Sequence, residues 1–290
     1  MADLVNAFRN AVAAHQSAPA LIEGDGRVIS FAQLLRQAAG FAADLQRRGV
    51  QKGDRALIAM PVSADLYAAL AGLWMVGAVA VFPEPALGLK GLRHAMRVAR
   101  PKLLIATGWY RFLRFLPALW RVKLMQPSGR GTPTETALSG GDPALMSFTS
   151  GSTGLPKCIL RSHGFLMAQQ AAVAPLLKAD DARDLVAFPV FVLVGIAEAD
   201  WTAMAQGRGL LVGRPVPAVE LRLDDDEVWV AGAHVNEGYL NPADDAANKV
   251  NEGGRTWHRT GDAGRLDPDG RLWLLGRHGA RVKVQNRWLY

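Results

Sequence analysis

The residues of this chain best suited to chemistry form a polar run, Ser147-Phe-Thr-Ser-Gly-Ser-Thr-Gly-Leu-Pro-Lys157, which directly follows the apolar residues 144–146. A glycine-rich turn that leaves a strand exposes backbone N–H groups, and these groups can surround the oxygens of a phosphate. Further donors come from one ammonium group and four hydroxyl groups, those of Lys157, Thr149, Ser150, Ser152 and Thr153. The run therefore predicts a loop that binds an anion.

The order of these residues weakens two other interpretations of the run. The Walker pattern has a glycine before its lysine, whereas Pro156 precedes Lys157 here, so a P-loop NTPase is not expected. The second interpretation is an ordinary surface loop rich in Ser, Thr and Gly. The ordered sequence from Thr149 to Lys157 argues against such an accidental loop.

The elements that must hold this loop alternate between helix and strand through the first half of the chain. Ser30 can cap a helix whose apolar residues recur at helical spacing as far as Leu45, and Gly49 is placed to end it. Further along, the pattern predicts helices at 63–74 and 89–100 and strands at 55–60, 79–82 and 103–106. This alternation predicts an α/β fold in which helices cover a sheet.

The last third of the chain has a different pattern. Strands are predicted at 221–223 and 227–231 around an acidic turn, and at 264–266 and 271–275 around the turn Asp267-Pro-Asp-Gly270. These strand pairs predict antiparallel hairpins, so the sheets of the whole chain should be mixed. Residues 125–143 are rich in Gly, Pro, Ser and Thr and predict a surface loop.

Bulk composition is that of a globular protein, since half of the 290 residues are hydrophobic. The opening residues lack the basic start and apolar core of a signal peptide, and Cys158, the only cysteine, cannot form an internal disulfide. The most apolar stretch, residues 66–82, is shorter than the ~20 residues that a membrane span needs. We therefore expect a cytoplasmic location, with peripheral membrane contact as an additional option.

The net charge of +7 is unevenly distributed. No acid lies between Glu84 and Glu135, while ten basic residues do: Lys90, Arg93, Arg97, Arg100, Lys102, Arg111, Arg114, Arg121, Lys123 and Arg130. Such a segment favours an anionic neighbour. Within residues 90–130, aromatic and leucine side chains interleave with the charges as in an interfacial helix, namely Trp109, Phe112, Phe115, Leu116 and Trp120.

Several partners fit this basic segment. An acidic carrier protein, a phosphorylated thiol and an anionic membrane surface are the candidates, and the alternative is a solvated basic face over ordinary core residues. Nucleic acid is not expected, because no recognised binding motif accompanies the charge.

At this point a family is recognisable, because the run from Thr149 to Lys157 resembles the nucleotide-phosphate loop of adenylate-forming ligases. These AMP-dependent enzymes include acyl-CoA synthetases, luciferases and the adenylation domains of peptide synthetases. The resemblance implies that the ATP pyrophosphate is held by Thr149, Ser150, Gly151, Ser152, Thr153, Gly154 and Lys157, with Lys157 also acting in catalysis.

Two further segments resemble the same family. Residues 232–239 resemble its core strand and turn, and His258-Arg-Thr-Gly-Asp262 resembles its Tyr-Arg-Thr-Gly-Asp. By resemblance, Asp262 accepts hydrogen bonds from the ribose hydroxyls, although a carboxylate after glycine is by itself usually a turn residue. Arg277, which follows Gly276, should lie near the ribose and phosphate.

A shorter match is Gly195-Ile-Ala-Glu-Ala199, which resembles what remains of the family's Tyr-Gly-x-Thr-Glu. The resemblance implies that Glu198 helps to hold Mg²⁺ and acts in catalysis. Val194 and Ala197 replace the tyrosine and threonine of the family pattern. A solvent-exposed helical glutamate is therefore the alternative interpretation of Glu198.

The resemblance implies a reduced version of the large N-terminal domain of acyl-CoA synthetases. Its first part is expected at residues 1–191 with the phosphate loop, its mixed β part at 192–276, and a hinge and stub at 277–290. Only 40 residues separate Lys157 from Glu198, so a block after Phe191 is expected to be missing. The hinge acid is replaced by Gly279, and the family's mobile C-terminal domain has no counterpart in the sequence.

The activity implied by the resemblance is AMP-forming ligation of a carboxylic acid. ATP and the acid would give acyl-AMP and pyrophosphate, followed by transfer to CoA or another thiol, or by internal ring closure. Fatty-acid ligases and olefin β-lactone synthetases are the most similar subgroups, on the segment Phe188-Pro-Val-Phe191 and on His258, Arg259, Trp273, Leu289 and Tyr290. The implied cofactors are ATP and Mg²⁺, with CoA as an option for the second step.

Three other hypotheses remain open from the sequence. The chain could be a catalytically impaired ATP- or AMP-binding partner or regulator of an intact ligase. It could be a peripheral membrane-binding module that uses residues 109–123. It could also be an incomplete gene product, whose exposed apolar surfaces would cause aggregation.

Overall fold

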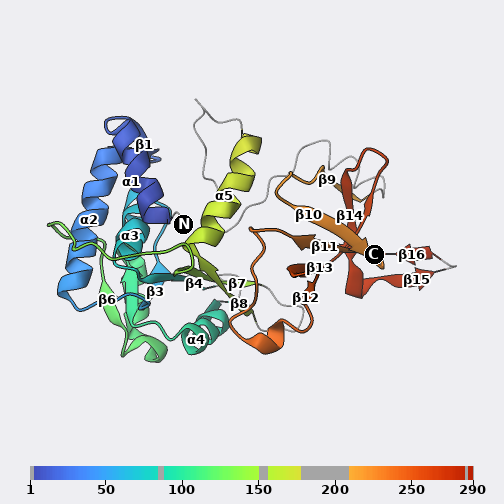
Figure 1. Ribbon diagram of the computed structural model, residues 1–290. Coiled ribbons are helices and arrows are strands. Elements are labelled where there is room, and N and C mark those ends of the chain that lie inside the picture. Colours follow the sequence, from blue (N-terminus) through green and yellow to red (C-terminus); the bar gives the residue numbers. More distant parts are fainter. Residues whose placement is uncertain (1–2, 84–87, 150–155, 178–208, 285–286, 290) are drawn as a thin grey trace. The chain divides into compact units, whose positions relative to one another are not determined.

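The computed structural model describes residues 3–83, 88–149, 156–177, 209–284 and 287–289. The chain divides into two compact units, unit 1 with residues 1–167 and 189–191, and unit 2 with residues 168–188 and 192–290 (Figure 1). The expected boundary after residue 191 lies outside the described residues. The boundary after residue 276 falls inside unit 2 and stays a prediction.

Unit 1 is built around a six-stranded sheet with the order β6-β5-β3-β4-β7-β8. The first five strands in this order run parallel, and β8 is antiparallel to β7. The expected mixed sheet is confirmed, and two of the predicted strands, β4 and β5, have the predicted bounds. The strands are β3 (Arg55–Ala59), β4 (Val79–Phe82), β5 (Leu103–Ala106), β6 (Lys123–Met125), β7 (Pro143–Thr149) and β8 (Lys157–Ser162).

Five α-helices and a small hairpin are also described between residues 4 and 177. They are α1 (Leu4–His15), α2 (Phe31–Arg47), α3 (Ala64–Met75), α4 (Gly88–Ala99), α5 (His163–Leu177), β1 (Pro19–Ile22) and β2 (Val28–Ser30). The predicted cap at Ser30 is confirmed. Ser30 and Gln33 form a reciprocal capping box at the start of α2, and the Ser63 hydroxyl accepts from the N–H of Leu66 in α3. Gly49 follows α2 with a φ of +80°, which suits glycine.

The core of unit 1 lies on both faces of the sheet, as expected for parallel strands. Alternate residues such as Ala56, Ile58 and Ile105 pack against α2 and α3. The intervening residues Leu57 and Leu104 point to the other face and are also fully buried. Figure 1 shows α4 on the side of the sheet opposite to α2 and α3. Both sheet faces are therefore covered, and the edge where the strands end is left for ligands.

The segment after β5 differs from its prediction. Residues 109–120 were expected to form an interfacial helix, but they form two 3₁₀ helices, η2 (Gly108–Phe115) and η3 (Pro117–Leu119). Pro117 cannot donate to a continuing helix, and it begins the second turn instead. Among the described helices, none combines the length and apolar character that a membrane span requires.

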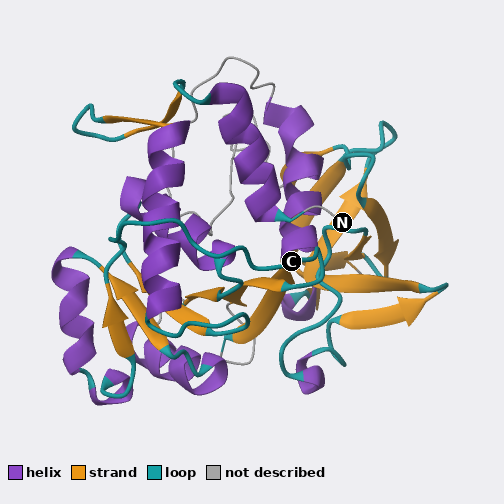
Figure 2. Ribbon diagram, turned by 60° about the vertical axis from the view of Figure 1, so that its left-hand side comes forward, coloured by secondary structure: helices purple, strands orange, loops and turns teal. Residues whose placement is uncertain are grey.

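Unit 2 consists mainly of strands, which are orange in Figure 2. Its sheet has the order β10-β11-β13-β14-β9, with β12 paired to β13, and all pairs are antiparallel. The predicted hairpins are confirmed. The bounds are β9 (Leu210–Gly213), β10 (Glu220–Asp224), β11 (Glu227–Ala231), η4 (Pro242–Asp244), β12 (Lys249–Glu252), β13 (Arg255–Leu266), β14 (Leu272–Arg277), η5 (His278–Ala280), β15 (Val282–Val284) and β16 (Arg287–Leu289).

Candidate nucleotide site

The predicted phosphate loop joins β7 to β8. The two strands form an antiparallel pair whose register places Thr149 opposite Lys157, so the loop begins and ends at the same end of this pair. Because β7 is parallel to β4, this connection lies at the carboxyl edge of the parallel strands, where open α/β sheets bind ligands. Residues 150–155 lie outside the described part of the chain. The structure thus fixes both ends of the loop, at Thr149 and at Lys157.

A histidine from α4 contacts the exit of this loop. The Nε2 atom of His94 lies 2.8 Å from the carbonyl oxygen of Pro156, within hydrogen-bond distance. The His94 ring also packs edge-on against Phe148, with ring centroids 6.1 Å apart. Both ends of the loop are therefore held by one side chain, which the sequence analysis did not select.

Two polar groups next to the loop are unsuited to catalysis. Burial raises the pKa of the Cys158 thiol to about 11, so this side chain is not a reactive thiolate. The hydroxyl of Ser147 accepts a hydrogen bond from Arg161 on β8. Ser147 is therefore committed to the sheet, whereas the predicted phosphate contacts begin at Thr149.

In unit 2 the structure brings two predicted nucleotide-binding residues together. Asp262 on β13 is directly opposite Arg277 on β14, and the Nη1 atom of Arg277 lies 3.1 Å from Oδ1 of Asp262. Burial raises the pKa of the Asp262 carboxyl; the charge of Arg277 lowers it, and the charge of Glu227 raises it further. Asp262 is thus a half-buried carboxylate with one cation beside it, and its role toward a ribose stays a prediction.

A buried glutamate that the sequence analysis did not select supports this aspartate. Glu227 is 4% exposed and accepts hydrogen bonds from three donors. They are the Nε atom of Arg259 at 2.9 Å, the indole Nε1 of Trp229 at 3.1 Å and the backbone N–H of Gly261 at 3.1 Å. No local signal in the sequence marks it, because Arg259 and Gly261 lie 32 and 34 residues later in the chain.

The hydrogen bonds of Glu227 stabilise a bulge in β13. Glu227 pairs with Ala263 and Trp229 pairs with Arg259, so one residue of β11, Val228, lies opposite three residues of β13, at positions 260–262. Gly261 lies in this bulge with a φ of +74°, which a residue with a side chain rarely adopts. The Thr260 hydroxyl donates to the carbonyl of Val228 and accepts from the N–H of Asp262. The bulge therefore fixes the backbone that carries Asp262.

The segment 232–239, which resembles the core turn of the family, is held by Lys249 on β12 and by Asp245 at the end of η4. The ammonium group of Lys249 donates to the carbonyl oxygen of Asn236, and the carboxylate of Asp245 accepts from the N–H of Tyr239 at 2.8 Å. Burial lowers the pKa of Lys249 to about 8, and the charge of Asp245 opposes this shift. The turn is therefore held by a lysine with an unusually low pKa.

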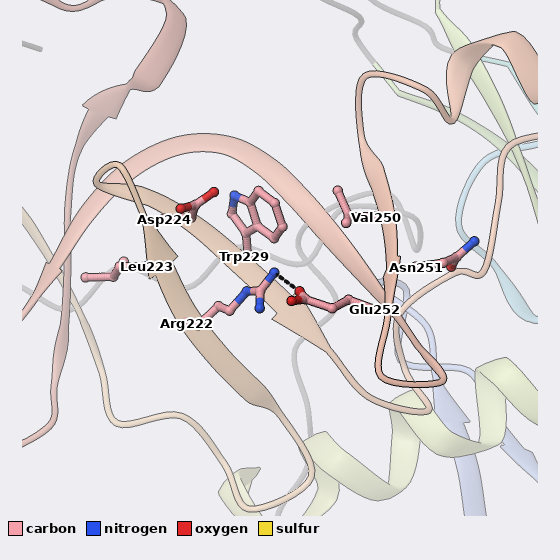
Figure 3. Close-up of a pocket in the computed structure, with 7 residues that line it drawn as sticks. All are labelled: Arg222, Leu223, Asp224, Trp229, Val250, Asn251 and Glu252. Atoms are coloured by element: carbon pink, nitrogen blue, oxygen red, sulfur yellow. Dashed lines mark ion pairs between the residues drawn. The ribbon is translucent and has the colours of Figure 1, made fainter.

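A pocket of about 480 Å³ lies on the surface of unit 2. Figure 3 shows its lining residues, among them Arg222 pointing toward Glu252, with an ion-pair distance of 2.6 Å. The guanidinium of Arg222 lies between two indole rings, 4.6 Å from the centroid of Trp229 and 4.4 Å from that of Trp257. The predicted site residues are not among those that line this pocket. We interpret it as the rim of a structural stack of arginine and tryptophan.

Metal binding was predicted at Glu198, which lies outside the described residues, as do Ser150, Gly151, Ser152, Thr153 and Gly154. Within the described ranges, no group of three or more His, Cys, Asp or Glu side chains is arranged to hold a metal ion. Mg²⁺ commonly binds through one or two carboxylates together with substrate phosphates.

These features match one protein family. The sequence profile described as AMP-binding enzyme matches residues 8–210, and the chain therefore belongs to the AMP-binding enzyme family.

Relatives and solved structures agree with this family. An olefin beta-lactone synthetase from Xanthomonas campestris pv. campestris is 27% identical over 188 residues, which cover 57% of this chain and 33% of that protein. Malformin synthetase mlfA from Aspergillus sclerotiicarbonarius is 28% identical over 228 residues, which cover 77% of this chain and 4% of that protein. The chain thus spans a third or less of the length of these relatives.

The fold is similar to that of a solved adenylation subdomain. The N-terminal subdomain of NpsA from Klebsiella oxytoca, in complex with 3-hydroxybenzoyl-AMSN, superposes with a TM-score of 0.75 at 18% identity. The match covers 96% of this chain and 100% of that one. The expected mixed α/β fold is confirmed, and it is similar to that of this N-terminal subdomain.

Proposed function

We propose that this chain is an AMP-forming acid ligase that activates a carboxylic acid, most suitably a fatty acid, with ATP. The observation that carries the proposal is the β7–β8 connection, in which a hydroxyl- and glycine-rich loop ends in Lys157 at the carboxyl edge of a parallel sheet. The ion pair of Asp262 and Arg277 supplies a second polar site for the sugar. A relative named p-hydroxybenzoic acid–AMP ligase supports an acid substrate.

The first step is transfer of the adenylyl group. A carboxylate oxygen of the acid attacks the α-phosphorus of ATP, the bond from this phosphorus to the bridging oxygen breaks, and pyrophosphate leaves with the electron pair. Donors that bind the leaving pyrophosphate lower the barrier, and the loop ending in Lys157 is the proposed source of these donors. Mg²⁺, when bound, neutralises phosphate charge during this step. Asp262 holds the ribose and orients the nucleotide.

The second step is proposed to be transfer of the acyl group. A thiolate of CoA or of another carrier attacks the acyl carbon, and AMP leaves with the bonding electrons. Internal ring closure of a hydroxylated acid is the variant that the olefin beta-lactone synthetase relative suggests. Cys158 is not the acceptor, because burial keeps its thiol protonated.

Acid-dependent exchange of pyrophosphate into ATP tests the proposal. A panel of fatty acids of increasing length is assayed with the chain, with Lys157→Ala and with Asp262→Ala. We expect exchange that requires an acid and falls by about a hundredfold or more in Lys157→Ala, as for other losses of transition-state donors. Glu220→Ala, at an exposed position on β10, is the control and should retain full exchange.

Two outcomes would contradict the proposal. Exchange that is equal in all variants would place the chemistry elsewhere. ATP binding without any acid-dependent exchange would instead support a nucleotide-binding partner or regulator of another ligase.

A further inference from the structure

The 3₁₀ segment after β5 presents three distinct faces. In a 3₁₀ helix every third residue lies on the same face. Leu113 and Leu116 are half-buried, and Leu119, the next position at this spacing, is 1% exposed. This leucine face anchors η2 to β5 and η3 to α4, with which they are in contact.

The second face is an exposed aromatic ridge formed by Trp109, Phe112 and Phe115. Their exposed fractions are 74%, 57% and 65%, and neighbouring ring centroids are 6.2 and 6.3 Å apart. Trp120, which is 72% exposed, is tied back to the ridge because its indole Nε1 donates to the carbonyl oxygen of Phe115 at 3.3 Å. Soluble proteins rarely leave four such rings exposed together, so this surface requires a partner.

The third face supplies positive charge beside the rings. Arg111 and Arg114 are three residues apart and exposed, and the guanidinium of Arg114 lies 5.3 Å from the Phe115 ring centroid. Arg121 is exposed directly after Trp120. Among the described residues, no carboxylate lies within ion-pair distance of these three arginines, and the sequence from 85 to 134 contains no acid.

We propose that the aromatic ridge and its three arginines bind the surface of an anionic lipid membrane. Indole rings favour the headgroup region, and arginines favour lipid phosphates, so both faces fit one planar partner. The ridge is convex along a helix, and its polar groups are guanidinium and indole donors. This composition fits an array of phosphate acceptors better than it fits the groove of a protein. The proposal is independent of the ligase activity.

Vesicle flotation of the full chain tests this inference. Vesicles of phosphatidylcholine are compared with vesicles that also contain phosphatidylserine. We expect binding to the anionic vesicles that weakens as salt is raised, because salt screens the arginines. Replacing all three arginines (Arg111→Gln, Arg114→Gln and Arg121→Gln) should reduce the partition coefficient by about a hundredfold, from the usual contribution of each basic residue.

A matched charge control separates the ridge from net charge. Arg36→Gln, Arg214→Gln and Arg265→Gln remove three exposed arginines elsewhere, and either triple variant lowers the net charge from +7 to +4. This control should retain anionic binding. A third variant, with Trp109→Ser, Phe112→Ser and Phe115→Ser, should lose binding at low and high salt alike, because insertion of the rings is not screened. Circular dichroism checks that each variant is folded.

Several results would overturn the inference. The first is no vesicle binding, and the second is equal loss of binding in both arginine variants. A third is self-association that the aromatic variant abolishes, which would assign the ridge to a second copy of the chain. A fourth is capture of an acidic carrier protein in the absence of vesicle binding.

Discussion

Replacement of Glu227 should destabilise unit 2 far more than replacement of an ordinary surface acid. The carboxylate is 4% exposed and satisfies three donors, one of which is a charged guanidinium. Removing one partner of a buried ion pair typically costs about 3–5 kcal/mol of unfolding free energy. Because the Arg259 side chain is 37% exposed, water can solvate part of it in the variant. We therefore expect about 3 kcal/mol for Glu227→Ala, at the lower end of that range.

The conservative variant separates charge from shape. Glu227→Gln keeps an acceptor for Gly261 or Trp229 and loses the ion pair, so we expect a loss of about 1–2 kcal/mol. Urea unfolding followed by far-UV circular dichroism and tryptophan fluorescence measures both variants. Glu237→Ala is the matched control and should stay within about 0.5 kcal/mol of the parent chain.

The same variants should also weaken nucleotide binding, because Glu227 fixes the bulge that carries Asp262. Glu227 is expected to act through the backbone, so AMP affinity should fall in the order parent, Glu227→Gln, Glu227→Ala. The reasoning would be refuted if Glu227→Ala cost no more than Glu237→Ala. It would also be refuted if Glu227→Ala unfolded more easily than the parent chain yet bound AMP with unchanged affinity.

Three further predictions concern other side chains. His163 is fully buried, and burial lowers its pKa, so below pH ~6.5 the unfolded chain binds a proton that the folded chain does not bind. The free energy of unfolding should therefore fall as the pH decreases below ~6.5. Urea midpoints at several pH values should show a shallower fall in His163→Gln. Arg222→Leu removes a guanidinium held between two indole rings and should cost about 1–2 kcal/mol in urea unfolding, whereas a loss near zero would mean that the stack contributes nothing. His94→Ala removes the contact to the loop exit at Pro156 and should weaken ATP binding. AMP binding should change less, because AMP has no pyrophosphate for the loop to hold. Equal losses of affinity for both nucleotides by calorimetry would count against this role of His94.

Local sequence signals were sufficient for the scaffold of unit 1. Ser30 caps α2 as predicted, because a serine hydroxyl reaches a backbone N–H only a few residues away, and Ser63 caps α3 in the same way. In unit 2, the turn at Asp267 is likewise stabilised by contacts between residues close together in the sequence. The carboxylate of Asp267 accepts hydrogen bonds from the N–H groups of Asp269 and Arg271. Hydrogen bonds from Trp273, which has the largest effect, and from Arg271 hold the pKa of Asp267 well below its usual range.

Long-range features escaped the sequence analysis. Glu227 is buried by partners 32 and 34 residues later in the chain, and no local pattern reports such a contact. His94 likewise meets Pro156 across 62 residues. The rings that interleave with charges in segment 109–120 predict one interfacial helix, because a short sequence does not separate the spacing of a 3₁₀ helix from that of an α-helix. The structure instead forms two 3₁₀ helices, the second of which begins at Pro117 and buries Leu119.

The predicted site could be placed only in part. Asp262 and Arg277 lie together, which follows from the pairing of β13 with β14. Lys157 begins β8 opposite Thr149. Glu198 and the centre of the phosphate loop lie outside the described residues, so their roles stay predictions.

Calorimetric titration of the chain with ATP and with AMP tests the central claim most directly. Lys157→Ala and Asp262→Asn serve as the paired variants. We predict that both nucleotides bind the parent chain and that Lys157→Ala weakens the binding of ATP more than that of AMP. Asp262→Asn should weaken the binding of both nucleotides. Its unfolding midpoint should stay unchanged or rise, because the substitution removes a half-buried charge. Absence of binding by folded parent protein, or equal affinities in all three proteins, would contradict the claim that this loop and this aspartate hold a nucleotide.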